Sequence, residues 1–238
     1  MNAQGRNKAG FIAPEGWPVI GGLALVAAVV SAAAWWIAAP AGIGAAVVSV
    51  VVLTWAVWFF RDPERRTPAG EGLIVSGADG VVSFAAPGGP PAELGLAPAE
   101  TDGMWRVSIF MNIFNVHVNR APVDAVVEKR SYRPGKFFNA SLDKASEHNE
   151  RLGLVLRTPS GRRLAVVQIA GLIARRIVCR VAEGAALSAG QRFGLIRFGS
   201  RVDHYVPGEY EVLVRVGDRS VAGETVIARR RTTTGGTP

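Results

Sequence analysis

The architecture follows from two adjacent stretches, VIGGLALVAAVVSAAAWWIAA (residues 19–39) and AGIGAAVVSVVVLTWAVWFF (residues 41–60), neither of which contains a charged residue. Each has about the 20 residues that an α-helix needs to cross a bilayer. Pro40 and Gly42 lie at the junction and indicate a tight turn. The sequence therefore predicts a transmembrane helical hairpin over residues 19–60, after a short N-terminal segment of residues 1–18.

The residues around the hairpin indicate its orientation. Indole rings favour the membrane interface, and tryptophans lie near the ends of both stretches at Trp35, Trp36, Trp55 and Trp58. Basic residues occupy both outer flanks, at Arg6, Lys8, Arg61, Arg65 and Arg66. By the positive-inside rule we expect a cell inner membrane protein whose remaining chain is cytoplasmic. The apolar run is too long for a signal peptide, whereas a shallow re-entrant hairpin stays an alternative.

A different pattern begins at about residue 68, where short runs rich in Val, Ile and Phe alternate with Gly and Pro. This pattern is typical of a mainly β domain, a sandwich or a partly closed barrel, which we place at residues 61–228. The predicted strands are residues 80–85, 105–111, 124–132, 153–158, 163–169, 177–181, 195–198 and 211–215. Residues 229–238 are basic and then rich in Thr and Gly, which predicts a flexible tail.

Composition excludes several classes of function. The formal net charge is +8, but the basic residues are dispersed and no base-stacking aromatic motif accompanies them, which argues against nucleic-acid binding. The single cysteine, Cys179, excludes an internal disulfide, and its apolar neighbours predict a buried, inert thiol. The three histidines and one cysteine lack metal-ligand spacing, so we expect no metal site. A glycine-rich phosphate loop is also absent.

The dipeptide Gly199-Ser200 follows the predicted strand of residues 195–198, which is apolar apart from Arg197. Alone, it is typical of a turn. A serine hydroxyl can also attack the preceding carbonyl and break its own peptide bond, and glycine permits the dihedral angles that this step needs. The resulting ester can eliminate and hydrolyse to a pyruvoyl group, an electrophilic ketone that captures amines and acts as an electron sink.

Such self-cleavage needs a base for the Ser200 hydroxyl. The chain contains three histidines: His117, His148 and His204. His117 lies in FMNIFNVHVNRAP (residues 110–122), where polar residues interrupt an apolar stretch and require partners if they are buried. Asp79, in SGADG (residues 76–80), is the carboxylate expected to orient His117. A satisfied core histidine and an Asp-Gly hairpin turn are the alternatives. A triad is defined by geometry, so these distant residues can meet in the fold.

Six motifs in one order resemble phosphatidylserine decarboxylase of the short, compact type. They are FFRDPERRTP (59–68), SGADG (76–80), FMNIFNVHVNRAP (110–122), PGKFFNASLDKASEHNER (134–151), IAGLIARRIV (169–178) and GQRFGLIRFGSRVD (190–203). The resemblance covers about residues 59–207. It implies a proenzyme that cleaves itself between Gly199 and Ser200 into a β chain of residues 1–199 and an α chain of residues 200–238, which remain associated as a heterodimer.

The resemblance also implies the chemistry. Ser200 would become a covalent pyruvoyl cofactor, which takes the amine of phosphatidylserine as a Schiff base and releases CO2 to give phosphatidylethanolamine. Asp79 and His117 match the carboxylate and the histidine of the family's self-cleavage triad. The enzyme would therefore be a carboxy-lyase of phospholipid biosynthesis, and a membrane hairpin suits its lipid substrate.

Two departures from the longer family members leave one role open. Those proteins carry a second histidine three residues after the first, where this chain has Arg120. They also have a Leu-Gly-Ser-Thr-like cleavage motif, where this chain has Phe198-Gly199-Ser200-Arg201. His117 could deprotonate Ser200, protonate the decarboxylated intermediate, or do both in turn.

An anionic lipid head group predicts cations along its approach. Arg175 and Arg176, in an otherwise apolar run, and Lys136 are the candidate substrate-binding residues. Residues 136–151 are dense in polar side chains and are expected to form either a loop over the site or a plain solvated loop.

Two other functions remain as alternatives. One is a membrane-anchored, non-enzymatic β module of the carrier type, which needs an exposed lysine at a tight turn. The other is a pyruvoyl decarboxylase of a different amine, against which the hydrophobic hairpin argues. The sequence leaves a higher oligomeric state open.

Overall fold

The computed structural model describes residues 10–138, 140, 148–171, 176–197 and 199–231 of the 238-residue chain. The chain divides into two units, Met1–Glu64 and Arg65–Pro238. Residues 61–64 therefore group with the helices, whereas the sequence assigned them to the β domain. Backbone hydrogen bonds explain the difference, because Asp62 N donates to Phe11 O over 2.9 Å and Ala13 N donates to Phe60 O over 2.8 Å.

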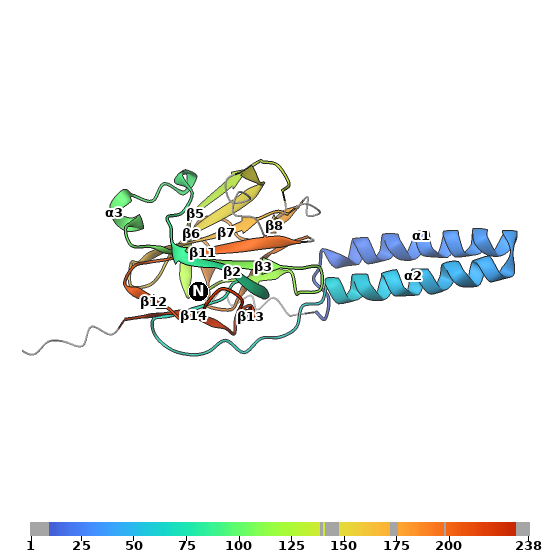
Figure 1. Cartoon of the computed structure of the whole chain (residues 1–238), viewed down its shortest axis with the longest axis horizontal. Coiled ribbons are helices and arrows are strands. Elements are labelled where there is room, and N and C mark those ends of the chain that lie inside the picture. Colours follow the sequence, from blue (N-terminus) through green and yellow to red (C-terminus); the bar gives the residue numbers. More distant parts are fainter. Residues whose placement is uncertain (1–9, 139, 141–147, 172–175, 198, 232–238) are drawn as a thin grey trace, which may run out of the picture. The chain divides into compact units, whose positions relative to one another are not determined.

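The first unit is a pair of α-helices, α1 (Gly16–Ile37) and α2 (Ala39–Phe59), which run side by side in Figure 1. Both helices are long and apolar enough to cross a membrane, judged by length and composition. The predicted helical hairpin is thus confirmed as a candidate membrane-spanning element.

The junction between the two helices lies earlier than the sequence predicted. Only Ala38, in an extended conformation, separates α1 from α2, and Pro40 lies in the first turn of α2. Proline suits that position because its φ is already helical and its missing N–H would have no partner there. Gly42 serves helix packing instead of the turn. A Cβ atom at residue 42 would lie 2.7 Å from Cα of Trp35, so its absence permits the close approach of the helices.

The second unit is mainly β (Figure 1). Its strands are β1 (Leu73–Val75), β2 (Gly80–Pro87), β3 (Trp105–Met111), β4 (Val118–Arg120), β5 (Ala125–Arg133), β6 (Arg151–Arg157), β7 (Arg163–Ile169), β8 (Ile177–Cys179), β9 (Ala186–Leu187), β10 (Arg192–Ile196), β11 (Ser200–Val206), β12 (Tyr210–Val212), β13 (Arg219–Ser220) and β14 (Val226–Arg230). Two short helical segments, η1 (Ala92–Leu94) and α3 (Pro98–Thr101), follow β2.

These strands form one large sheet and two small ones. The large sheet has the order β13-β2-β3-β11-β7-β6-β5-β9, and the small sheets have the orders β1-β14-β12 and β4-β10-β8. The large sheet is curled into a half-barrel, which confirms the predicted partly closed barrel. Register shifts between Val82 and Phe84, and between Val127 and Lys129, mark bulges, which increase the local twist of a sheet.

Strand β7 shows how the sequence produces the centre of the large sheet. Its side chains alternate between two apolar clusters: Leu164 and Val166 join the larger cluster, and Ala165, Val167 and Ile169 join the smaller one. A strand that is buried on both faces appears as a continuous apolar run. The sequence accordingly predicted β7 with its observed bounds.

Strand β11 was not predicted, although it lies beside β3 and β7 in the middle of the large sheet. It pairs Ser200 with Met111 of β3 and Arg201 with Ile169 of β7. Every residue of β11 is buried, yet Arg201, Asp203 and His204 are polar. Apolar periodicity therefore does not reveal this strand. Buried polar groups need partners, so the position of β11 depends on hydrogen bonds from its neighbours.

Several other strand boundaries differ from the sequence-based expectations. Strand β10 begins earlier than the predicted run of residues 195–198, and β8 ends before residue 181. Strand β14 continues through Arg230, two residues into the segment predicted as a tail. It does so because Arg230 N donates to Gly72 O over 2.8 Å and Tyr210 of β12 pairs with Arg230.

Candidate active site

Ser200 is the first residue of β11, and the bond that precedes it lies in a tight bend. Gly199 has a φ of 47°, in the left-handed region that glycine adopts without a Cβ clash. The Ser200 side chain is fully buried, and its Oγ has no hydrogen-bond partner among the described residues. An unpaired buried hydroxyl is costly, so this residue is a strong candidate for chemistry.

His117 follows a rigid turn at the end of β3. The turn is closed by reciprocal hydrogen bonds between its ends, since Asn112 N donates to Asn115 Oδ1 over 2.9 Å and Asn115 N donates to Asn112 O over 3.1 Å. The His117 ring is buried, and its Nδ1 lies 3.0 Å from the carbonyl oxygen of Asn115. A carbonyl only accepts, so Nδ1 carries a proton in this contact, and in the neutral form of the ring the lone pair is therefore on Nε2.

The backbone brings His117 close to the segment that leads into Ser200. Ile196 N, at the end of β10, donates to His117 O over 3.3 Å. Met111, at the start of the His117 turn, is the direct partner of Ser200 in the sheet. Both sides of the cleavage segment therefore contact the connection that carries His117.

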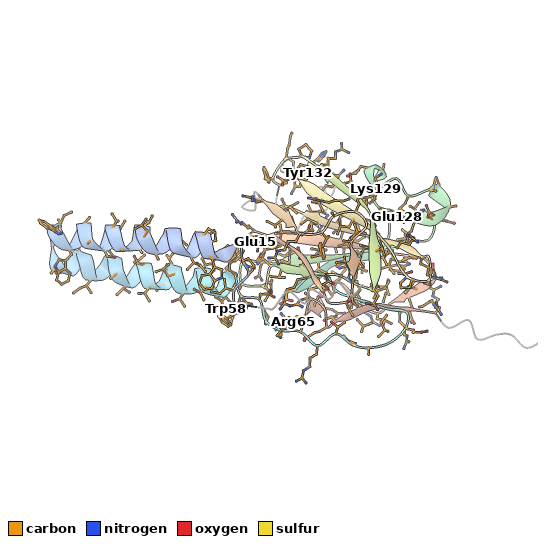
Figure 2. The ribbon with its side chains drawn as sticks, turned by 180° about the vertical axis from the view of Figure 1, so that it is seen from behind. Glu15, Trp58, Arg65, Glu128, Lys129 and Tyr132 are labelled. Carbon is orange, nitrogen blue, oxygen red and sulfur yellow. The ribbon has the colours of Figure 1, made fainter. Side chains whose placement is uncertain are left out.

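Asp79 lies in the loop between β1 and β2, and both of its carboxylate oxygens have partners. Oδ2 accepts from Arg65 Nη2 over 2.8 Å, and Oδ1 accepts from Ala222 N over 2.8 Å. Arg65, labelled in Figure 2, also lies 3.8 Å from Glu224 through Nη1. From the sequence, Arg65 is one of the basic residues that flank the membrane hairpin. The structure makes it the ion-pair partner of the candidate triad carboxylate.

A buried polar network lies on the Ser200 face of β11. Gln168 of β7 donates through Nε2 to Asn119 Oδ1 over 2.7 Å. Asn119, on β4, donates through Nδ2 to Met111 Sδ at 3.7 Å and to Gly77 O at 3.5 Å. These bonds satisfy the side chain of Asn119, one of the polar residues that interrupt the apolar stretch at residues 110–122, and they join the large sheet to a small one.

His204 connects β11 to the Asp79 loop. Its Nε2 accepts from Gly77 N over 2.8 Å, which places the proton on Nδ1, 3.3 Å from Val107 O. Gly77 O in turn accepts from Arg120 N over 3.0 Å. A Cβ at residue 77 would lie 2.8 Å from Arg120 O, so the loop can be held this closely only by a glycine. His204 is thus a positioning residue, and the sequence assigned it no role.

We expect His204 to make stability depend on pH. Burial lowers the pKa of His204 to about 4 from its ordinary value of 6.5. Between these values the unfolded chain binds a proton that the folded protein excludes, so its contribution to stability is complete above pH 6.5 and is lost as the pH falls toward 4. The loss amounts to as much as about 3 kcal/mol.

Chemical unfolding in detergent at several pH values measures this effect. The wild type should lose more unfolding free energy on acidification than His204→Gln. His148→Gln, which removes an exposed ring, is the matched control and should retain the wild-type dependence. An equal pH dependence in His204→Gln and the wild type would contradict the role of His204.

Arg120, three residues after His117, has a structural role. Its side chain is buried, and Nη1 donates to Gly190 O over 3.0 Å.

Arg201 and Asp203 alternate with Ser200 along β11 and so lie on the opposite face of the sheet. They form a buried ion pair, with Arg201 Nε 2.8 Å from Asp203 Oδ1. This ion pair was not predicted from the sequence.

Two of the three predicted substrate-binding cations, Arg176 and Lys136, occupy exposed positions. Arg176 is exposed, and its carbonyl oxygen accepts from Arg197 N over 3.3 Å, beside the cleavage segment. Lys136 is exposed and pairs with Asn149 in an isolated bridge. Arg175 lies outside the described residues.

Cys179 is partly buried, and burial raises the pKa of its thiol, as expected of an inert cysteine.

The described residues contain no group of three or more His, Cys, Asp or Glu side chains suited to a metal ion. They do contain a buried, unpartnered hydroxyl beside a left-handed glycine, with a buried imidazole on the adjoining connection. A hydroxyl next to a carbonyl in this setting can act as an internal nucleophile.

Comparisons with known proteins give the family. A sequence model of the family described as phosphatidylserine decarboxylase matches residues 52–228. The phosphatidylserine decarboxylase proenzyme of Cereibacter sphaeroides is 58% identical over 181 residues, 76% of this chain and 77% of the relative. That of Ruegeria pomeroyi is 56% identical over 181 residues, 76% of this chain and 81% of the relative. That of Beijerinckia indica is 51% identical over 221 residues, 93% of this chain and 90% of the relative. The chain belongs to the phosphatidylserine decarboxylase family.

Proposed function

We propose that this chain is a phosphatidylserine decarboxylase proenzyme that cleaves itself between Gly199 and Ser200. The observation that carries the proposal is the fully buried Ser200 Oγ, which has no hydrogen-bond partner among the described residues and follows a glycine with φ of 47°. Family membership and the names of the relatives support the substrate and the processing.

Cleavage begins when Oγ of Ser200 attacks the carbonyl carbon of Gly199. The Oγ–C bond forms, the C–N bond breaks, and the hydroxyl proton passes to the departing nitrogen. Elimination then takes the Cα proton of Ser200 and releases the Gly199 carboxylate. Hydrolysis of the remaining unsaturated residue consumes one water, releases one ammonia and leaves a pyruvoyl terminus on the α chain. His117 is the proposed base, and its Nε2 carries the lone pair that this role needs.

The residues around Ser200 suit a pyruvoyl group. Burial excludes water, and the oxygen of residue 200 begins without a competing partner in the described part of the chain. Once formed, a pyruvoyl group supplies a ketone that condenses with a primary amine and withdraws electrons from the carbon that bears the carboxylate. His117 is the proposed donor of the proton that replaces CO2 on that carbon, while the Asp79 loop, held by His204, supports this side of the site.

The topology supports a stable association of the two products. Cleavage would place β11 in the α chain, and β11 pairs along its length with β3 and β7 of the β chain. Strands β12 and β13 of the α chain lie in two different sheets. A heterodimer therefore retains the sheet, and dissociation would expose most of its core.

A lipid substrate would account for the apolar N-terminal helices, because the substrate itself lies in a membrane. We propose that α1 and α2 span the cell inner membrane, with the β domain on the cytoplasmic side. The basic flanks Arg6, Lys8, Arg61 and Arg66 support this orientation. Arg176 and Lys136, together with Arg175, which precedes Arg176 in sequence, are the proposed cations for the anionic head group.

The carrier alternative is weaker in light of the fold. A carrier lysine projects from a hairpin turn, but Lys129 lies within β5, beside Glu128 in Figure 2. Lys136 lies in a bridge with Asn149, and Lys144 lies outside the described residues. A mass increase on an intact, uncut chain would favour the carrier function.

The test of the function is turnover of a defined lipid. Purified protein in mixed detergent micelles should convert phosphatidylserine into phosphatidylethanolamine and CO2, as measured by lipid mass spectrometry. Free serine, which has the same amine and carboxylate but no lipid, should react at least about 100-fold more slowly, since remote binding energy contributes to the chemical step. Equal rates with free serine would contradict a lipid decarboxylase.

A further inference from the structure

The carbonyl group of Gly199, which Ser200 attacks in the proposed cleavage, packs against the backbone of Gly171. A Cβ atom at residue 171 would lie 1.8 Å from Gly199 O and 2.9 Å from Gly199 C. Neither distance is compatible with non-bonded atoms, so the observed position of the carbonyl requires glycine at residue 171. Gly171 is buried and lies two residues after the end of β7.

Hydrogen bonds from Asn149 fix the position of this glycine. Asn149 Nδ2 donates to Ala170 O over 2.7 Å and to Phe138 O over 2.8 Å, while its Oδ1 accepts from Phe138 N over 2.9 Å. Ala170 N also donates to Glu150 O over 2.9 Å. The side chain of Asn149 is buried, so these bonds are protected from water. The residue before Gly171 is thus held on both its N–H and its carbonyl.

Ala140 lies next to the contact between Gly171 and the Gly199 carbonyl, and its position is also fixed by a hydrogen bond. The Cβ of Ala140 would lie 3.3 Å from a Cβ at residue 171, so Ala140 closes the remaining space. Arg201 Nη1 donates to Ala140 O over 3.2 Å, and Arg201 is paired with Asp203. The residue that follows Ser200 therefore helps to hold the wall that faces the Gly199 carbonyl.

We propose that Gly171 is a positioning residue for self-cleavage, and that Asn149 holds it in place. In the attack the Oγ–C bond forms and the carbonyl electron pair moves onto Gly199 O. The carbonyl must keep one face toward Oγ while this occurs. The bare Cα of Gly171 leaves room for Gly199 O and limits its rotation. This inference rests on the proposed function, because it concerns the geometry of that cleavage.

The test is the rate at which the full-length chain is cut after synthesis, followed by intact mass. Gly171→Ala should be cut at least about 100-fold more slowly than the wild type, since misplacement by about 1 Å can cost that much. Gly208→Ala is the matched control. Its Cβ would lie 3.0 Å from Gly103 O, a backbone carbonyl at the opposite end of β11, and it should be cut at the wild-type rate.

Treatment with hydroxylamine distinguishes a block of the initial attack, which this proposal predicts, from a block after the ester has formed. It cleaves an ester to a hydroxamate and a free serine terminus but leaves an amide intact, so a chain stalled after the attack would be cut by it. Gly171→Ala should stay uncut, because the block precedes the ester. Thermal unfolding and size-exclusion profiles close to those of the wild type would show that the fold is retained.

Each outcome decides the proposal. Cleavage of Gly171→Ala at the wild-type rate, or equal slowing in Gly208→Ala, would overturn it. If Gly171→Ala fails to fold, Asn149→Ser decides instead, because serine is too short to reach Ala170 O. Slow cleavage of that variant supports the proposal, and normal cleavage refutes it. An uncut wild type would refute the proposed function itself, which is a separate result.

Discussion

Ser200→Ala should yield a single uncut chain with no measurable conversion of phosphatidylserine. The substitution removes the only atom that can attack the Gly199 carbonyl in the proposed step, and with it the source of the ketone. The decarboxylation rate should therefore fall more than about 10³-fold, to the background reaction. Gel analysis and intact mass measure the loss of self-cleavage, and the lipid assay measures the loss of decarboxylation.

Stability should change little in this variant. The Ser200 hydroxyl is buried and has no described partner, so its removal sacrifices no hydrogen bond, and the change in unfolding free energy should be within about 1 kcal/mol. Ser83→Ala is the matched control, since it deletes a serine hydroxyl from β2 that donates to Ser108 O over 3.3 Å. It should be cut normally. Retained turnover of the lipid by Ser200→Ala would refute the pyruvoyl mechanism.

His117→Ala should lose self-cleavage. General bases contribute about 10² to 10⁴ in rate, so the processing rate should fall by at least about 10². The expected result follows from the fixed tautomer, in which Nδ1 donates to Asn115 O and Nε2 can accept the Ser200 proton. A time course of chain cutting in detergent, begun immediately after cell-free synthesis, measures this rate.

The control for His117 is His148→Ala. His148 is exposed and lies edge-on to Phe138, with ring centroids 6.2 Å apart, so its removal should leave processing unchanged. Normal processing of His117→Ala would remove His117 from the self-cleavage step. It would then be left with proton transfer to the decarboxylated carbon, a role that appears as reduced turnover by the matured chains.

Apolar periodicity predicted those parts of the fold in which burial and sequence pattern agree. The two helices, and β3 and β7 with their observed bounds, are of this kind. Strand β11 was missed because its buried side chains include Arg201, Asp203 and His204, which apolar patterns exclude. Only three-dimensional pairing shows how a polar strand can lie in the middle of a sheet.

The candidate site likewise contains some residues that the sequence reveals and others that only the fold reveals. Ser200, His117 and Asp79 could be selected by residue type and motif, and their roles stay predictions. The residues that hold them could not be selected. Arg65 was interpreted as a membrane flank, His204 had no assigned role, and Gly171 was one glycine among 28. Their importance lies in contacts with residues far away in sequence, such as Gly77 with His204.

The most direct test of the account is the intact mass of the purified wild-type protein. We predict two chains, residues 1–199 and residues 200–238, the smaller of which has a pyruvoyl terminus that resists N-terminal sequencing. Their summed mass should equal that of the precursor plus one water minus one ammonia. A single unmodified chain, or a cut that leaves a free Ser200 amine, would contradict the account.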